Sequence, residues 1–235
     1  MGKIVITGAS SEIGWAIARE LSTMGKPMLL HGTREHDLPL DELSTEAEYV
    51  VADFASPAGL DYFIAQLDDV DILVNAAACT ITNLLPQIED ESIDKMIAVN
   101  IGALAKICKA VIPPMCAKRS GIIINITSVV ASRVYRGQSI YAGTKAFAEA
   151  MSKGVAAEFG QRGVRCNCVA PGSIYSGSLK LLAHLAKDQV KESNAMAAMG
   201  EPKDVAAAVA FLCREDNKFI NGTVLHVDGG HWMGL

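Results

Sequence analysis

A tyrosine and a lysine stand four residues apart, at Tyr141 and Lys145 in the segment YAGTK. On a helix, side chains at this spacing share one face, so an ammonium group would lie next to a phenol. The cation stabilises the phenolate, which makes the hydroxyl group a usable proton donor and acceptor. Ser128 ends an apolar run upstream, where it could bind the carbonyl oxygen that Tyr141 would protonate. The pattern predicts carbonyl or alcohol chemistry, although many amphipathic helices carry the same pair by chance.

A glycine-rich segment, TGASSEIG, spans residues 7–14 between a β-rich run and a helical pattern. Glycines at such a junction let the backbone pass close to a diphosphate, while the helix N-terminus offers amide donors and a positive dipole end. An ordinary tight turn would look similar. The segment predicts a dinucleotide site, and the expected contacts are Gly8, Ser10, Ser11, Ile13 and Gly14.

Short apolar runs alternate with helical patterns along the whole chain. Continuously apolar runs fit strands that are buried on both faces of a parallel sheet. The expected strands are Lys3 to Thr7, Pro27 to His31, Tyr49 to Ala52, Asp71 to Val74, Gly121 to Thr127, Val164 to Val169 and Thr223 to Val227. The fold class is therefore α/β, a single domain over residues 1–235 with a doubly wound seven-stranded parallel sheet and helices on both faces.

The connecting segments carry further expectations. Phe147, Met151, Val155 and Phe159 repeat at helical spacing, which predicts a helix of about five turns with this stripe facing the core. The polar segment 34–48 should form only a loop or a stub of helix. Residues 173–199 are expected to form a helical insertion that acts as a substrate lid.

Composition limits the possible partners. The chain has 235 residues, is 50% hydrophobic and carries Lys+Arg 21 against Asp+Glu 26, which gives a net charge of -5. Disorder is excluded, and an acidic chain has no overall electrostatic reason to bind nucleic acid or an anionic membrane. Six scattered cysteines without a CxxC pair or a Cys/His cluster predict core thiols in a reducing cytoplasm and no metal. The most apolar later stretch, Val205 to Cys213, is too short to span a membrane.

The glycine-rich segment and the set Asn100, Ser128, Tyr141 and Lys145 resemble the short-chain dehydrogenase/reductase family, with its TGxxxGxG fingerprint and Asn-Ser-Tyr-Lys tetrad. The resemblance extends over residues 7–230 and implies a Rossmann fold and hydride transfer between a nicotinamide and a carbonyl carbon. It implies that Ser128 orients the carbonyl oxygen and that Tyr141 delivers the proton. Lys145 would assist the tyrosine and bind the nicotinamide ribose, and Asn100 would support the proton relay through water.

One residue departs from the family fingerprint. Glu12 stands where the middle glycine is usual, and a carboxylate pointing at the diphosphate would repel it. Glu12 is therefore expected to project outward from a helical backbone.

The resemblance also indicates the cofactor. In this family an acid at the end of the second strand favours NAD, whereas here Thr33 stands at that position and Arg34 follows with a guanidinium suited to a 2'-phosphate. We expect NADP(H), with a solvated loop charge as the alternative interpretation of Arg34. The family motifs imply further cofactor contacts at Asp53, Phe54, Asn75, Ala76, Ala77, Tyr141, Lys145, Pro171, Gly172, Ile174 and Ser176.

Within the family the chain is most similar to reductases of 3-oxoacyl thioesters on acyl carrier protein, because INITSVV at residues 124–130 is typical of them. Such enzymes serve fatty-acid, polyketide or polyene assembly. Arg119 and Arg162 match the positions that hold the acidic carrier, and we expect them beside the active site, with ordinary solvated turn charges as the alternative. Tyr135, Tyr175, Met196 and Met199 are candidates to line the substrate pocket.

Two other functions remain open on the sequence. The chemistry could serve a free alcohol, sugar or steroid, or the chain could be a dinucleotide-binding regulator without turnover. The family resemblance further implies a homotetramer.

Overall fold

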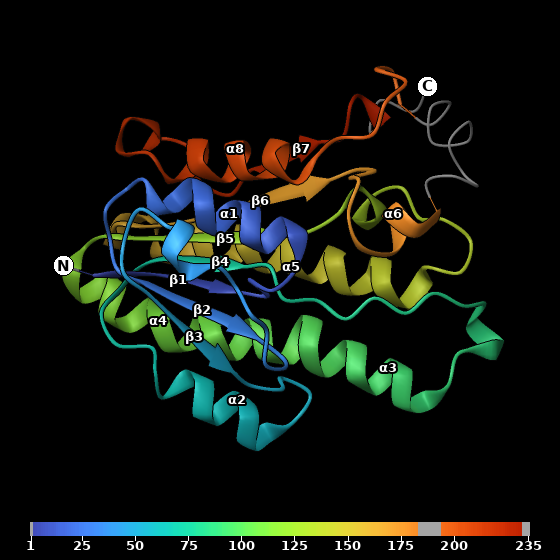
Figure 1. Cartoon of the computed structure of the whole chain (residues 1–235), viewed down its shortest axis with the longest axis horizontal. Helices are drawn as coiled ribbons and strands as arrows, with labels where there is room; N and C mark the ends of the chain where they lie inside the picture. The colour runs from blue at the N-terminus through green and yellow to red at the C-terminus, as the bar shows by residue number, and fades with distance from the viewer. Residues whose placement is uncertain (1, 183–193, 232–235) are drawn as a thin grey trace.

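Seven parallel strands form one sheet, in the order β3-β2-β1-β4-β5-β6-β7 (Figure 1). The computed structural model describes residues 2–182 and 194–231. The strands span Lys3–Thr7 (β1), Met28–Gly32 (β2), Ala47–Val51 (β3), Val70–Asn75 (β4), Gly121–Ile126 (β5), Val164–Pro171 (β6) and Val224–Val227 (β7). The predicted doubly wound Rossmann sheet is confirmed, with every strand end within two residues of its predicted place.

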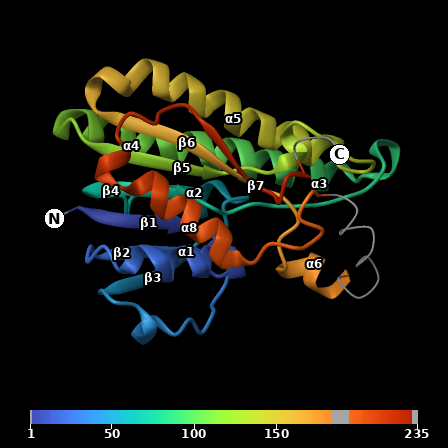
Figure 2. The ribbon, with the colours of Figure 1, turned by 90° about the horizontal axis from the view of Figure 1, so that it is seen from above.

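Helices cover both faces of the sheet (Figure 2). α1 (Glu12–Ser22) and α8 (Pro202–Cys213) share one core cluster with Ile4 and Ile6 of β1. α2 (Pro57–Ile64), α4 (Leu104–Lys118) and α5 (Ser139–Phe159) share the other cluster with Val5. Alternate residues of β1 thus point to opposite layers, as the pleat of a strand requires. The remaining helical segments are α3 (Asp90–Ile97), α6 (Gly177–Leu182), the π-helical turn η3 (Ala98–Ala103) and the 3-10 turns η1 (Leu40–Glu42), η2 (Leu85–Gln87), η4 (Val129–Ala131), η5 (Gly160–Arg162) and η6 (Glu215–Asn217).

Two of the three expectations for the connecting segments can be compared with the structure. The β2–β3 connection contains only η1, as predicted. α5 has 21 residues and its stripe faces the core as predicted, since Val155 belongs to a core cluster against which Phe147, Met151 and Phe159 pack. Met151 and Phe159 are only partly buried and also line a groove against α4. The expected lid is described only in part, since residues 183–193 lie outside the described residues and α6 is the helix that remains.

The run Asp90–Lys118, formed by α3, η3 and α4, is long and apolar enough to cross a membrane by length and composition, with a mean hydropathy of 1.6 in its best window. The sequence analysis considered only the short stretch Val205 to Cys213 and did not point to this longer run. A core helix passes the same test, and Ile107, Val111 and Met115 of this run belong to the core cluster on the sheet.

His31 ties the end of β2 to the loop after β1. Its ring is fully buried and stacks on Phe54, with ring centroids 3.9 Å apart. Nδ1 accepts a hydrogen bond from Gly8 N–H at 3.2 Å, and Nε2–H donates to the Ala52 carbonyl oxygen at 2.8 Å. These bonds select the neutral tautomer with the proton on Nε2. Burial lowers the pKa of His31 to about 4.

The buried imidazole predicts a loss of stability in acid. The folded protein keeps His31 neutral down to about pH 4, whereas the unfolded chain protonates it below 6.5. The unfolded state binds the extra proton in this window, so the free energy of unfolding falls as the pH decreases, by at most about 3 kcal/mol from this group. Urea unfolding followed by circular dichroism at pH 7.5, 5.5 and 4.5 measures the slope.

His31→Phe is the matched variant, because it keeps the aromatic stack and cannot titrate. It should flatten this part of the pH dependence while losing about 1 to 3 kcal/mol at neutral pH for the two missing hydrogen bonds. An unchanged slope in the variant would show that other groups govern the acid sensitivity.

Candidate active site

The loop after β1 makes a close backbone approach to the loop after β4. Gly8 has a φ of +69°, and a Cβ there would lie 2.7 Å from the Ala77 backbone. Thr7 joins the two loops, since its carbonyl oxygen accepts from Ala76 N–H at 3.2 Å and its hydroxyl oxygen from Ala77 N–H at 3.1 Å. Only glycine meets both requirements at position 8. The role of Thr7 was not foreseen, because its partners lie far along the chain.

The N-terminus of α1 opens onto the same crevice. Ser11 caps it, with Oγ accepting from Gly14 N–H at 3.0 Å and donating to the Gly8 carbonyl oxygen at 2.8 Å. A Cβ at Gly14 would lie 2.2 Å from that carbonyl oxygen. The first amides of a helix have no acceptor within the helix, and Ile13 lines the cavity described below. A glycine cradle with free helix amides fits the diphosphate of a dinucleotide.

The loops after β2 and β3 border the crevice further along the sheet edge. Thr33, Arg34 and Asp53 are exposed there, and the Tyr49 hydroxyl group donates to the Arg34 carbonyl oxygen at 2.9 Å. A Cβ at Gly32 would lie 1.9 Å from the Tyr49 oxygen and 2.8 Å from Ser10 Oγ, so position 32 has no room for a side chain.

Two predicted cofactor residues turn their side chains away from the crevice. Phe54 is 3% exposed and stacks on His31 in the core. Asn75 is also buried, and its Nδ2 donates to Asn125 Oδ1 at 2.8 Å across β4 and β5. The Phe54 side chain thus packs in the core, and the Asn75 side chain joins β4 to β5.

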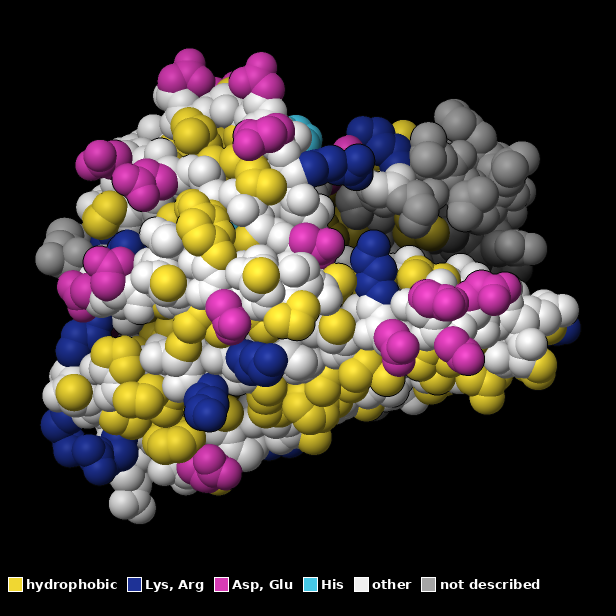
Figure 3. Space-filling view, turned by 90° about the horizontal axis from the view of Figure 1, so that it is seen from below, with side chains coloured by type: hydrophobic (Ala, Val, Ile, Leu, Met, Phe, Trp, Pro, Cys, Tyr) yellow, Lys and Arg dark blue, Asp and Glu magenta, His cyan; other side chains and the backbone are white. Residues whose placement is uncertain are grey.

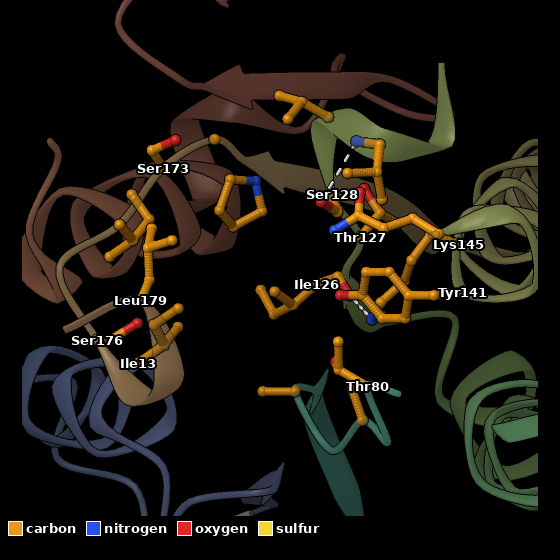
Figure 4. A pocket seen from close by; sticks show the side chains of 18 of the residues that line it. Ile13, Thr80, Ile126, Thr127, Ser128, Tyr141, Lys145, Ser173, Ser176 and Leu179 are labelled. Carbon is orange, nitrogen blue, oxygen red and sulfur yellow. Dashed lines mark hydrogen bonds between the residues drawn. The ribbon is translucent and has the colours of Figure 1, made fainter. Parts of the chain in front are cut away.

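A cavity of 480 Å³ lies at the carboxyl ends of the strands (Figure 4). Ser128 and Tyr141 direct their hydroxyl groups into it from one side, and Ile13, Ser176 and Leu179 form the facing wall. Ala76, Pro171, Gly172 and Ile174 also line it, whereas Gly8, Ser10, Thr33 and Arg34 do not. The described residues contain no cluster of three His, Cys, Asp or Glu that could hold a metal.

Lys145 lies beneath the tyrosine on α5. It is 6% exposed, its Nζ donates to the Ile126 carbonyl oxygen at 2.8 Å, and this nitrogen is 5.7 Å from the centre of the Tyr141 ring. Ser128 Oγ accepts from Val130 N–H at 3.3 Å. The structure thus brings Ser128, Tyr141 and Lys145 together, with the ammonium fixed by a strand end and the two hydroxyl groups free to face a ligand.

Asn100 plays a supporting part. It lies in η3, and its Nδ2 donates to the Cys79 carbonyl oxygen at 2.8 Å and to Thr144 Oγ1 at 3.0 Å. Its Oδ1 accepts from Cys79 N–H at 2.7 Å. The side chain therefore holds the loop after β4 against α5 beside Lys145, and it does not line the cavity.

The segment after β6 closes another side of the cavity. Gly172 N–H donates to the Val227 carbonyl oxygen at 2.9 Å, and a Cβ at Gly172 would lie 2.7 Å from Asp228 Cβ. Ile174 is buried, and Ser176 N–H donates to the Ile174 carbonyl oxygen at 2.8 Å. This tight turn carries the chain from the sheet edge over to α6.

Known proteins are similar to this chain in both sequence and fold. The family model described as Enoyl-(Acyl carrier protein) reductase matches residues 8–231. The chain belongs to the short-chain dehydrogenase/reductase family. The 3-oxoacyl-[acyl-carrier-protein] reductase of Haemophilus influenzae is 36% identical and covers 99% of both chains. That of Escherichia coli is 35% identical over 99% of this chain and 98% of its own. A solved 3-oxoacyl (acyl-carrier-protein) reductase from Agrobacterium tumefaciens with NADP bound has a TM-score of 0.91 at 25% identity, covering 97% of this chain and 93% of that chain.

The two arginines expected beside the active site lie elsewhere on this short-chain dehydrogenase fold. Arg119 and Arg162 precede β5 and β6, and Arg119 Nη2 donates to the Gln161 carbonyl oxygen at 3.0 Å. They are neighbours, but at the amino ends of the strands, whereas Ser128 follows the carboxyl end of β5. A six-residue strand spans about 20 Å, so the pair is not beside the cavity of its own chain.

The cavity also contains residues that the family motifs did not point to. Gln138 and His231 line it, and so does Tyr135, which was a candidate. Tyr175, Met196 and Met199 do not line this cavity, and the two methionines border a separate one. His231 escaped notice because it lies far in sequence from the other residues of the site.

Glu12, the residue that departs from the family fingerprint, is accommodated as expected. It opens α1 with its side chain exposed, and Oε2 accepts from Gly177 N–H at 2.7 Å. Oε1 accepts from Lys180 Nζ at 2.9 Å, and hydrogen bonds from Lys180 and Gly177 lower the pKa of Glu12. The carboxylate joins the dinucleotide loop to the first turn of α6, across the mouth of the cavity.

We expect the contact of Glu12 with Gly177 and Lys180 to slow the local opening of the segment around Gly177. Glu12→Ala removes the acceptor of the Gly177 amide, so hydrogen–deuterium exchange over residues 175–180 should accelerate several-fold. Global stability should fall by less than about 1 kcal/mol, because exposed ion pairs contribute little. Glu20→Ala, an exposed change on the same helix, is the control. Equal exchange in both variants would mean that the contact does not restrain α6.

Proposed function

We propose that the protein is an NADPH-dependent reductase of 3-oxoacyl thioesters carried on acyl carrier protein. The observation that carries the proposal is the convergence of Ser128, Tyr141 and Lys145 on one cavity beside the cradle at Gly8 and Gly14. The names of the Haemophilus and Escherichia relatives support the choice of substrate. A dehydrogenase of free alcohols, sugars or steroids is the second candidate, and a cavity lined by both polar and apolar side chains would also suit it.

The cofactor site would extend from the cavity along the sheet edge. The chemistry that bound NADPH supplies is hydride donation to the carbonyl carbon. The amides at Ile13 and the turn at Gly8 would hold its diphosphate, and Arg34 would bind the 2'-phosphate. Lys145 and the segment from Pro171 to Ser176 would bind the nicotinamide half.

The protein's own residues then account for the proton. Ser128 Oγ–H donates to the substrate carbonyl oxygen and fixes its position, and Tyr141 Oη–H donates its proton to the same oxygen as the alcohol forms. The ammonium of Lys145, held by Ile126, stabilises the phenolate that remains. Asn100 and Thr144 keep this part of α5 in register and would support reprotonation of the tyrosine from solvent.

The assembly is proposed to be a cytoplasmic homotetramer. A groove of 610 Å³ between α4 and α5, with Ile112, Met151 and Phe159 among its residues, runs along a face where apolar side chains gather (Figure 3). Packing a second copy into the groove would bury this apolar surface. The segment 173–199 is proposed as the substrate lid.

Tyr141→Phe tests the proposed chemistry. It removes the proton donor and leaves the ring, so kcat for a 3-oxoacyl carrier substrate should fall by about 10²- to 10⁴-fold while NADPH still binds. NADPH absorbance measures turnover, and fluorescence titration measures binding. Tyr62→Phe, on the exposed surface of α2, is the control. Turnover that survives in Tyr141→Phe would refute the mechanism, and no turnover in the unaltered protein would favour a dinucleotide-binding regulator.

Arg119→Glu with Arg162→Glu tests carrier docking. The two arginines lie at the edge of the sheet opposite the cavity of their own subunit. We therefore propose that this docking surface serves the cavity of another subunit. We expect KM for the carrier-bound substrate to rise about tenfold or more, with little change for the coenzyme A thioester. Arg19→Glu with Lys153→Glu changes the net charge equally and is the control. If both double variants changed KM equally for both substrates, the effect would come from the net charge and the proposed docking role of the two arginines would be refuted.

A further inference from the structure

His231 and Gln138 give the cavity two polar atoms that lack partners. Both residues line the cavity that holds Ser128 and Tyr141. Within the described part of the chain, His231 Nδ1 and Gln138 Oε1 are buried and make no hydrogen bond. Folded proteins rarely leave buried polar atoms unsatisfied, because each costs the lost hydration. Two such atoms in the residues of one cavity wall are therefore candidates for partners that a bound molecule would supply.

The backbone holds His231 firmly in place. Arg133 Nη1 donates to the His231 carbonyl oxygen at 3.1 Å, and His231 N–H donates to the Asp228 carbonyl oxygen at 3.2 Å. Asp228 Oδ1 in turn accepts from Gly230 N–H at 2.9 Å, which closes the turn after β7. The histidine is 4% exposed. Its ring is therefore preorganised in the cavity wall rather than carried on a loose chain end.

Tyr135 sets the hydrogen-bonding character of the ring. Its hydroxyl group is hydrogen-bonded to His231 Nε2. When the phenol donates to Nε2, the ring proton resides on Nδ1, so Nδ1 becomes a donor. Burial, together with the charge of Arg133, lowers the pKa of His231 and favours the uncharged ring. His231, a residue of the cavity wall, thus carries a neutral N–H donor in addition to the hydroxyl groups of Ser128 and Tyr141.

A 3-oxoacyl thioester has two carbonyl oxygens separated by one carbon atom. We infer that His231 Nδ1–H binds the thioester carbonyl oxygen while Ser128 and Tyr141 bind the ketone oxygen. A neutral donor suits an uncharged thioester, whereas a substrate carboxylate would call for Arg or Lys. His231 is then a positioning residue that selects 3-oxo thioesters over simple ketones. This inference rests on the proposed function.

The test compares two substrates in His231→Phe. One is the N-acetylcysteamine thioester of acetoacetate, and the other is the matched thioether ketone, in which a methylene group replaces the thioester carbonyl. We expect the variant to lose roughly 10-fold in kcat/KM for the thioester, mainly through KM, and less than about 2-fold for the ketone. Tyr135→Phe should give a smaller loss with the same substrate dependence, and His36→Phe, an exposed loop change, should have no effect.

The outcomes separate this inference from the proposed function. Equal losses on both substrates, or none on either, would overturn the role of His231 while leaving ketoreduction intact. Failure of the unaltered enzyme to reduce the thioester would refute the proposed function itself. If the enzyme does not reduce the thioether ketone, the inhibition constant of this ketone against thioester reduction replaces KM in the comparison. NADPH affinity and the melting temperature of each variant show whether the change is confined to the substrate.

Discussion

The contact between the loop after β1 and the loop after β4 is the constraint on which the site depends. β1 and β4 are neighbours, but their chains leave the sheet toward opposite faces, which opens a crevice at their carboxyl ends. Thr7 joins the two loops, and Gly8 allows them to touch. The amide of Gly8 is also bound by His31 from β2. The cradle is thereby fixed from two sides before any ligand arrives, and the cavity with Ser128 opens beside it.

Much of this arrangement could be predicted from local sequence. β2 and β5 were recognisable because both of their faces are buried, so each forms a largely apolar run whose length matches one crossing of the sheet. The proximity of Tyr141 and Lys145 follows from helical spacing alone. Ser128 joins them because parallel strands bring their carboxyl ends to one edge. In each case the decisive geometry is contained in a short segment or in the topology of the sheet.

The features that the sequence did not predict have a different physical origin. The motif at Phe54 did not predict its stack on His31, because that contact depends on a residue from another strand. Periodicity placed the stripe on α5 against the core, but it could not show that the stripe also borders a groove against α4. Arg119 and Arg162 were expected beside the cavity, although residues that precede a strand lie at its opposite edge. Glu12 and His231 meet partners 165 and 96 residues away, at distances that no spacing rule covers.

The charge of the cavity follows from one buried cation. Lys145 is the only charged side chain among the described residues that line the cavity, and it takes part in none of the ion pairs found in that part of the chain. A buried ammonium without a carboxylate is costly, and a carbonyl oxygen from Ile126 offsets only part of the lost hydration. A carboxylate partner would remove that cost but also cancel the positive potential that favours a tyrosine anion. Ile13 and Leu179 on the facing wall are apolar and offer no dipoles that would screen this potential. The neutral groups of Ser128 and His231 can then orient a substrate without competing for the charge of Lys145.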